Sequence, residues 1–311
     1  MGEVQAGGWG LGTGDWGLGT GDRGEGKWCG GGRVDPVIFL PLSWPFPRLS
    51  ILRPYAMPLA DSAILLEPTV TVLSRPQFVE PGHMPVQWMG ESTDGERLAE
   101  FAGRLCYMSQ RNPAQRSTRE YLENIKKQGH GSVLEHANYS ILLEGVSRSL
   151  THELVRHRAG FAYSQLSQRY VDESAACFVM PPAMIGDAAL EDAWRTQVTA
   201  ALDSYIALVD ALITRYGWVD DKVHRRKMAR EAARGVLPNS TETKIVVTGN
   251  ARAWRTMLEL RSSEGAELEI RRLAVAVLRV LVAEAPAFFS DFEIYEGVDR
   301  REAARIGYHK V

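Results

Sequence analysis

The composition of the chain changes abruptly near residue 57, and this change restricts which part can fold. The first 56 residues are rich in glycine and contain the heptapeptide Trp-Gly-Leu-Gly-Thr-Gly-Asp twice in succession, at 9–15 and 16–22. Such a segment has too little apolar surface to offset the conformational entropy lost on folding. A secretory signal would need a basic start and an apolar run, so targeting is the weaker alternative. We therefore expect residues 1–56 to be a disordered extension, with Met57 a candidate start of the protein, and residues 57–311 to form the folded domain.

The rest of the sequence is typical of one globular domain. The 311-residue chain is 45% hydrophobic, which is enough to build a sizeable core. From residue 63 onward no second linker rich in Pro, Gly or Ser divides the sequence. We therefore expect a single catalytic or binding domain.

Charge, hydropathy and cysteine content exclude several classes of protein. The formal net charge is −2, whereas a nonspecific nucleic-acid binder normally carries a broad basic surface. No run of about 18 apolar residues is present, and the apolar stretch 37–44 is short and contains proline. The three cysteines, Cys29, Cys106 and Cys177, match no metal-ligand spacing. We expect a cytoplasmic protein that binds neither nucleic acid nor a membrane.

Local patterns predict long helices interleaved with isolated strands. Ser117 or Thr118 is a suitable N-cap for a helix that ends before Gly129, and Asn250 is a suitable N-cap for a helix that carries Arg252 and Arg261. Further helices are expected at 147–158, 190–216, 222–234 and 267–284, and strands at 138–143, 177–180 and 242–248. This mixture predicts an α+β domain.

A cationic segment at 156–170 is the strongest indication of a ligand. It holds three arginines, a histidine, two serines and two glutamines but no carboxylate. On the predicted helix just upstream, Arg148, His152 and Arg156 fall at i, i+4 and i+8, so they share one face. A solvated charged face is the commoner origin of such a stripe. The acid-free loop that follows favours binding instead, because its donors suit phosphate oxygens and amide-like ring edges.

Two catalytic alternatives for this region are weak. His152, Glu153 and His157 form His-Glu-x-x-x-His, which has one residue more than the zinc motif His-Glu-x-x-His and turns the second imidazole by about 100°. No metal site is therefore expected. Ser164 and Ser167 lack the surroundings of a Gly-x-Ser-x-Gly nucleophile elbow, so a binding role is favoured.

Two further polar segments are ambiguous by themselves. Residues 129–136 contain two glycines that let a ligand approach the backbone, but they match neither a dinucleotide fingerprint nor a phosphate-gripping loop. His130 and His136 could equally be packed, hydrogen-bonded histidines. Residues 234–243, taken alone, could be no more than a helix stop.

Taken together, these segments closely resemble the flavin-dependent thymidylate synthases. The resemblance rests on motifs that occur in family order: Gly-His-x-Ser-x-x-Glu-His at 129–136, Ser-Arg-Ser-x-Thr-His-Glu-Leu-x-Arg at 147–156, Arg-His-Arg at 156–158 leading to Ser167, Arg-x-Val-Leu-Pro-Asn at 234–239, and Thr-Gly-Asn-x-Arg-x-Trp-Arg at 248–255. It extends from about Pro68 to Glu296.

The resemblance implies an architecture and a reaction. Family members have long helices packed on a small mixed or antiparallel sheet, and they form homotetramers whose active sites lie between subunits. They bind FAD, dUMP, methylenetetrahydrofolate and NADPH, and they convert dUMP to dTMP. Reduced flavin carries the one-carbon unit and supplies the hydride, so no protein nucleophile is needed.

The resemblance also assigns roles to residues by position. FAD would be contacted by Ser132, Arg156, His157, Arg158, Gln165, Asn250, Ala251, Arg252 and Thr256. The dUMP site would comprise Glu153, Leu154, Val155, Arg156, Gln165, Leu166, Ser167, Gln168, Arg169, Arg234 and Arg261, with 165–169 supplied by a neighbouring subunit. Arg261 would be catalytic, because a fixed cation beside the uracil ring stabilises the enolate-like charge that develops there.

Three departures from the family pattern stand out. The segment 159–166 has one residue more than is usual between Arg158 and Ser167, so 159–162 must bulge or follow another path. Thr256 stands where relatives often offer His or Asn to the flavin, and Gly265 stands where many have His. Both departures lower the expected flavin affinity or turnover.

Two other functions are less consistent with the sequence. A noncatalytic nucleotide-binding protein on the same scaffold would be expected to lose Arg261, Arg234 or the Arg-His-Arg element, and all are present. An RNA-binding module built on the basic helix 222–234 would need aromatic stacking residues and a more basic chain.

Overall fold

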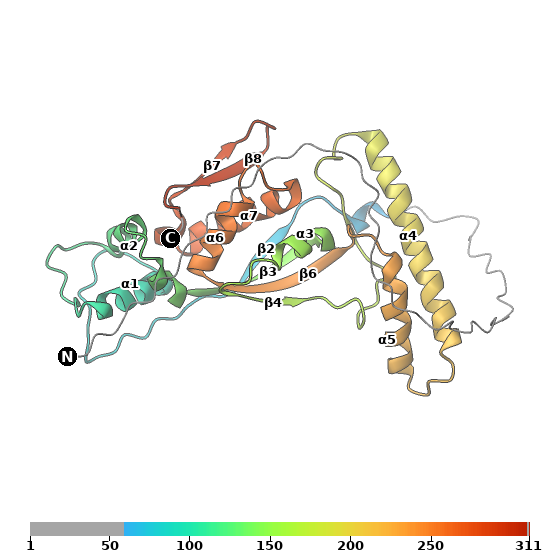
Figure 1. Ribbon diagram of the computed structural model, residues 1–311, viewed down its shortest axis with the longest axis horizontal. Helices are drawn as coiled ribbons and strands as arrows, with labels where there is room; N and C mark the ends of the chain where they lie inside the picture. Colours follow the sequence, from blue (N-terminus) through green and yellow to red (C-terminus); the bar gives the residue numbers. More distant parts are fainter. Residues whose placement is uncertain (1–58, 310) are drawn as a thin grey trace, which may run out of the picture. The chain divides into compact units, whose positions relative to one another are not determined.

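The computed structural model describes residues 59–309 and residue 311, which belong to one compact unit. The predicted extension, residues 1–56, lies outside the described residues. Figure 1 shows a sheet with helices packed against it and a separate pair of helices, α4 and α5, beside it. The described part of the chain is therefore an α+β fold, as the sequence predicts.

The central sheet is antiparallel throughout. Its strands are β2 (Thr69–Ser74), β3 (Asn138–Ser147), β6 (Glu242–Asn250) and β4 (Phe161–Gln165), hydrogen-bonded in the order β2-β3-β6-β4. In β3 the alternate side chains of Tyr139, Ile141 and Leu143 are buried, as expected for a strand with one face on the core. The predicted strands 138–143 and 242–248 are confirmed as β3 and β6, and both are longer than predicted.

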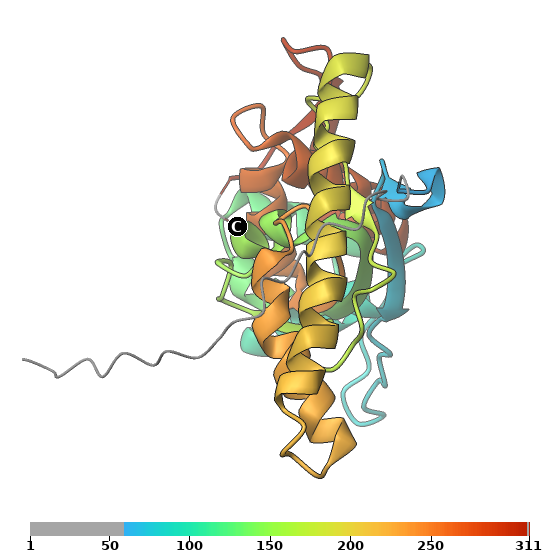
Figure 2. The same ribbon diagram turned by 90° about the vertical axis from the view of Figure 1, so that its right-hand side faces the viewer.

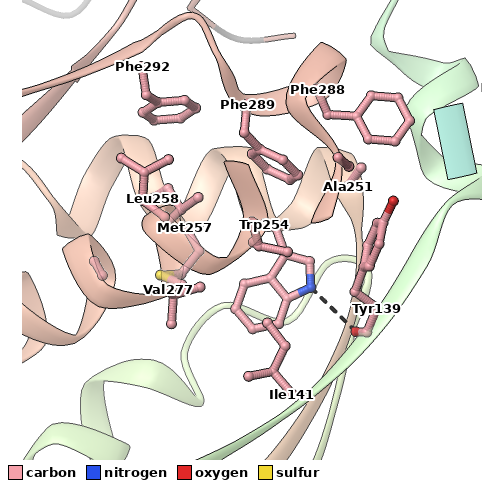
Figure 3. Close-up of a cluster of buried hydrophobic side chains, with 14 of the residues drawn as sticks. Tyr139, Ile141, Ala251, Trp254, Met257, Leu258, Val277, Phe288, Phe289 and Phe292 are labelled. Carbon is pink, nitrogen blue, oxygen red and sulfur yellow. Dashed lines mark hydrogen bonds between the residues drawn. The ribbon is translucent and has the colours of Figure 1, made fainter. Parts of the chain in front are cut away.

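Helices α6 (Ala251–Arg261) and α7 (Leu268–Glu284) pack on the buried face of the sheet and contribute a large share of the core there. Figure 3 shows Trp254 at the centre of this core, close to Ile141 and Tyr139 of β3. The indole Nε1 donates a hydrogen bond of 3.5 Å to the carbonyl oxygen of Tyr139. A fully buried aromatic ring of this size contributes strongly to stability through the apolar area it removes from water.

The cap of α6 fixes the direction in which its arginines leave the sheet. Asn250, the last residue of β6, accepts a hydrogen bond of 2.8 Å at Oδ1 from the backbone N–H of Ala253. This confirms the predicted N-cap. Because strand and helix are joined without a loop, Arg252 and Arg261 are placed at the two ends of a short, rigid helix.

Two helices and a 3-10 turn precede β3. Both α1 (Asp94–Cys106) and α2 (Thr118–Lys127) begin with a capping box, at Thr93 and Ser117, and a 3-10 segment, η2 (Gly131–His136), follows. The predicted helix after Ser117 is confirmed as α2, whereas α1 was not predicted.

Helices α4 (Ala188–Arg215) and α5 (Lys222–Ala233) lie side by side, as Figures 1 and 2 both show. They correspond to the predicted helices 190–216 and 222–234. Among the described residues, α4 is the one helix long and apolar enough to cross a bilayer by length and composition: an 18-residue stretch has a mean hydropathy of 1.2 and is 17% buried. One such helix is weak evidence for a span, because helices that pack against other protein surfaces have the same character.

The remaining elements are short. They are η1 (Asp61–Ala63), β1 (Ile64–Leu65) paired in parallel with β5 (Phe178–Val179), η3 (Arg234–Val236), α8 (Pro286–Phe289), and the hairpin of β7 (Phe292–Glu296) and β8 (Glu302–Ile306). The predicted strand 177–180 is confirmed as β5.

The predicted helix 147–158 is wrong in its extent. The observed helix, α3, covers only Arg148–Leu154, so Arg156 does not share a helical face with Arg148 and His152. Beyond the end of the helix, the Tyr163 hydroxyl lies 3.1 Å from the carbonyl oxygen of Leu154 and 2.5 Å from that of His157, and its one proton is shared between them. The carbonyl of Leu154 also accepts a hydrogen bond of 3.1 Å from the backbone N–H of His157.

The loop expected at 158–170 is also partly wrong, because its residues 161–165 form the edge strand β4. The irregularity expected at 159–162 is confined to the turn at 159–160. Gly160 has φ +75°, and a Cβ atom there would lie 2.6 Å from Nδ2 of Asn250. Glycine therefore suits this turn both by its conformation and by the space available.

Candidate active site

Arg261, at the carboxyl end of α6, is held by two residues from the end of α3. Its Nη1 lies 2.7 Å from Oε2 of Glu153, and its Nε donates to Nε2 of His157 at 3.0 Å. Strands β3 and β6 are antiparallel, so α3 and α6 start from opposite ends of the sheet and run toward each other. A β6 of nine residues spans about 30 Å, while α6 and α3 measure about 16 and 10 Å, so their carboxyl ends meet.

The contact with Arg261 sets the protonation state of His157. An Nε2 atom that accepts a hydrogen bond carries no proton, so this imidazole is neutral. Burial lowers the pKa of His157 below its ordinary value, and the positive charge of Arg261 lowers it further. His157 and Glu153 thus orient a guanidinium that stays charged.

The segment 165–169 leads from the end of β4 into a tight turn. Gln165 donates from Nε2 to the hydroxyl oxygens of Thr151 at 3.1 Å and of Thr243 at 3.3 Å. Further along, Arg169 forms an ion pair of 3.1 Å between its Nε and Oε2 of Glu231 on α5. The segment is therefore fastened to α3, β6 and α5 at once.

The other residues assigned to dUMP differ in what they can offer. Arg234 begins η3, directly after α5, and is half-buried. Leu154 is completely buried in the core, so only its backbone can face a ligand, whereas the side chain of Val155 is exposed. Gln168 is buried, and its Nε2 has no hydrogen-bond partner among the described residues.

Ser132 and Arg252 line one pocket of about 340 Å³, although they come from η2 and α6. Arg252 forms an ion pair of 2.6 Å from Nη1 to Oε1 of Glu135. Gly131 permits this approach, because a Cβ atom there would lie 3.1 Å from Nε of Arg252 and 2.3 Å from the carbonyl carbon of Val311.

Arg156 and Arg158 are exposed, and neither guanidinium pairs with a carboxylate of the described residues. Ser132 and Arg252 line the pocket described above, whereas Arg156 and Arg158 do not. By type, guanidiniums, a hydroxyl and glycine-rich backbone are donors that suit a dianionic pyrophosphate. The residues assigned to FAD therefore fit the phosphate part of that cofactor.

Comparison with known proteins decides the family. The sequence pattern of the family described as "Thymidylate synthase complementing protein" matches residues 89–287. The chain belongs to this family. It is 49% identical over 241 residues to the protein named "Flavin-dependent thymidylate synthase" of Mycobacterium sp. (strain JLS), which covers 76% of this chain and 94% of that relative. The proteins of the same name from Mycobacterium marinum (strain ATCC BAA-535 / M) and Mycobacterium tuberculosis (strain ATCC 25177 / H37Ra) are 47% identical over 237 residues, again 76% of this chain and 94% of each relative.

Two residues assigned to FAD have side chains that are buried or already hydrogen-bonded within α6. Ala251 is fully buried, so only its backbone can contribute. Thr256 is exposed, and its hydroxyl donates to the carbonyl oxygen of Arg252 at 3.1 Å, within α6. Gly265 has no atom within 4 Å of a Cβ position, so it leaves open space. At the two positions that depart from the family pattern, Thr256 therefore has its hydroxyl bonded within α6, and Gly265 leaves open space.

The structure brings the family motifs together in two groups. Arg261, Glu153 and His157 form one contact cluster, and Arg252 shares a pocket with Ser132. None of the hydrogen bonds and ion pairs within residues 59–309 links Arg169 or Arg234 to Arg261. Within the described residues of one chain, the assigned dUMP residues are therefore not all joined by hydrogen bonds or ion pairs.

Sequence reasoning missed several residues around the site. Cys106 and Tyr107, at the end of α1, line the pocket of Ser132 and Arg252. Their helix, α1, was not predicted, although Thr93 and Glu96 have the spacing of a capping box, which indicates the start of a helix. Thr151, which is part of the motif at 147–156, was given no role of its own, and Glu231 lies outside every motif; both fasten the segment 165–169.

Proposed function

We propose that this chain is a flavin-dependent thymidylate synthase that methylates dUMP to dTMP, with methylenetetrahydrofolate as the one-carbon donor. The chain is a family member, and the observation that carries the proposal is the cluster in which Arg261 contacts Glu153 and His157. These two residues belong to family motifs that lie more than 100 residues earlier in the sequence. A cation fixed at the end of a rigid helix is what pyrimidine activation without a protein nucleophile requires.

FAD would be held by the guanidiniums of Arg156, Arg158 and Arg252 and by the hydroxyl of Ser132. When bound, reduced FAD would carry the one-carbon unit and supply the hydride. NADPH is the proposed reductant of the flavin. The pocket beside Ser132 and Arg252 supports this assignment, because it places a guanidinium and a hydroxyl around one cavity.

The residues of the chain itself bind, orient and polarise. Glu153 and the neutral imidazole of His157 hold the Arg261 guanidinium in one direction, so its charge is organised before the pyrimidine arrives. Cys177 is not an activated nucleophile, because burial raises the pKa of its thiol and keeps it protonated near neutral pH. Arg261 is thus the catalytic residue that the geometry favours.

Arg169 and Arg234 are proposed to hold the phosphate of dUMP. Arg169 is paired with Glu231, but both side chains are substantially exposed, and such pairs contribute only about 0–1 kcal/mol. A doubly charged phosphate can therefore replace Glu231 at small energetic cost. This exchange would move the Arg169 guanidinium from α5 to the nucleotide.

A homotetramer in which 165–169 serve a neighbouring subunit is part of the proposal. Two features support it. Within the described residues of one chain, no hydrogen bond or ion pair joins Arg169 or Arg234 to Arg261. The apolar stretch of α4 is only 17% buried, which suits a helix that packs against other copies. A cytoplasmic location accords with the cofactors and substrates proposed.

The purified protein should show the visible absorption of bound flavin. Under anaerobic conditions NADPH should bleach that absorption faster in the presence of dUMP, and addition of methylenetetrahydrofolate should yield dTMP, detected by chromatography. Nucleotide binding without dTMP formation by FAD-loaded protein would instead support a noncatalytic nucleotide-binding protein. A protein that binds neither FAD nor dUMP would refute both functions.

A further inference from the structure

The backbone of Leu166 is held from both sides. Its N–H donates to the carbonyl oxygen of Lys244 at 2.9 Å, which continues the ladder of β4 and β6 by one step. Its carbonyl oxygen accepts a hydrogen bond of 2.9 Å from Nη2 of Arg148, the first residue of α3. Leu166 is the residue directly before Ser167, so this double attachment lies at the entrance of the nucleotide-binding segment.

Gln165, the preceding residue, is attached to the same place on α3. The buried hydroxyl of Thr151 donates to the carbonyl oxygen of Arg148 at 2.9 Å and accepts from Nε2 of Gln165 at 3.1 Å. Arg148 therefore reaches Leu166 through its side chain, and it reaches Gln165 through its carbonyl and the Thr151 hydroxyl. Two adjacent residues of 165–169 are clamped by one turn of helix.

Arg148 is itself anchored to the segment that follows Arg234. Its backbone N–H donates to the carbonyl oxygen of Thr241 at 3.1 Å, and that of Ser149 donates to Asn239 at 3.0 Å. Burial lowers the pKa of its guanidinium, the charge of Glu173 opposes this change, and the charge of Arg234 adds to it. The start of α3 thus ties together two segments that the family motifs assign to the nucleotide.

The turn after Leu166 is built on Ser167. The backbone N–H groups of Tyr170 and Val171 donate to the Ser167 carbonyl oxygen at 3.2 and 3.0 Å, and the N–H of Arg169 lies 3.4 Å from the Ser167 hydroxyl. A shift of Leu166 would therefore carry Ser167 and Arg169 with it.

We propose that Arg148 and Thr151 are positioning residues, which hold segment 165–169 in the conformation that binds the nucleotide. Neither residue needs to touch the substrate, because they act through Gln165 and Leu166. The inference rests on the proposed function. All of these contacts lie within one chain, so a preformed segment is available to whichever subunit completes the site.

The test measures binding of dUMP to FAD-loaded protein by isothermal titration calorimetry, together with KM and kcat for dUMP. Arg148→Met removes the donor but keeps a long side chain, and Thr151→Val removes the hydroxyl but keeps the shape. Loss of a hydrogen bond from a charged group should weaken dUMP binding about tenfold or more, and loss of the neutral one about threefold. KM should rise by similar factors, with FAD content unchanged and kcat affected less.

Conservative variants and a matched control separate positioning from general stability. Thr151→Ser restores the hydroxyl and should bring dUMP binding back to within about twofold of wild type. Arg301→Met is the control, because Arg301 also donates from Nη2 to a backbone carbonyl, that of Pro182 at 3.0 Å, outside the proposed site. It should leave dUMP binding unchanged.

Wild-type protein that neither binds dUMP nor forms dTMP would overturn the proposed function itself. With an active wild type, dUMP binding by Arg148→Met that equals that of Arg301→Met would overturn the positioning role. If Arg148→Met fails to fold, the Thr151 variants decide: weakened binding in Thr151→Val that Thr151→Ser restores supports the clamp, and equal binding in both refutes it.

Discussion

Replacing Arg261 by alanine tests the central part of the proposed mechanism. The substitution removes the Nη1 contact with Glu153 and the Nε hydrogen bond to His157 without creating a buried cavity, because Arg261 is only half-buried. The FAD-assigned side chains of Ser132 and Arg252 lie elsewhere, around their own pocket. The substitution should therefore act on pyrimidine activation and leave FAD bound.

The structure predicts a large kinetic effect and a small effect on stability. The side chain of Glu153 is 34% exposed and that of Arg261 22%, so water can solvate Glu153 once its partner is gone. Loss of such a pair should lower the free energy of unfolding by about 1 kcal/mol, or roughly 2–4 °C in Tm. Loss of a preorganised group that stabilises charge in the transition state lowers kcat by about 10²–10³.

The assay is anaerobic formation of dTMP by FAD-loaded protein, with Tm and flavin content measured on the same preparation. Arg279→Ala is a suitable control, because Arg279 forms an exposed ion pair with Glu302 on another part of the domain. It should keep full turnover. Turnover by Arg261→Ala within about tenfold of wild type, with FAD bound, would refute the role of Arg261.

Three further predictions follow from individual residues. The pKa of His157 is lowered in the folded protein, so the unfolded chain takes up a proton before the folded protein does as the pH falls. The neutral imidazole of His157 therefore stabilises the fold fully above about pH 6.5, and this stabilisation is lost on acidification below that pH. The kcat/KM for dUMP should fall in the same pH range. A His157→Gln variant with an unaltered acidic limb would contradict this origin. Trp254→Ala should lower the free energy of unfolding by about 3–5 kcal/mol in urea titrations, because the ring is fully buried; a change below about 1 kcal/mol would show that the core is packed differently. Gly160→Ala should lower the free energy of unfolding by about 1–2 kcal/mol and weaken FAD binding, because φ is +75° and the new methyl group would press on Asn250. Gly265→Ala, where space is open, should leave stability unchanged. Equal Tm values for the two variants would contradict the turn described at 159–160.

Much of the fold was predictable because the relevant signals are local. Asn250 caps the helix that follows it through a bond to a residue three positions along, and Ser117 does the same for α2. Signals of this range can be read directly from the sequence. The carboxyl end of α3 could not be predicted, because the carbonyl groups of Leu154 and His157 are satisfied by Tyr163, which reaches them only after the chain has turned back. Nor could β4 be predicted, since its hydrogen-bond partners lie on β6, some 80 residues further along.

Which side chains are available for chemistry can be read from the amino-acid sequence: the arginines, the amides and hydroxyls of 165–169, and the family to which their order belongs. This is possible because residue types and short spacings are properties of the covalent chain. That Arg261 meets Glu153 and His157, and that Arg148 and Thr151 hold the segment before Ser167, is visible in the folded chain alone. These contacts depend on the antiparallel pairing of β3 with β6, because it makes α3 and α6 run toward each other. They also depend on the pairing of β4 with β6.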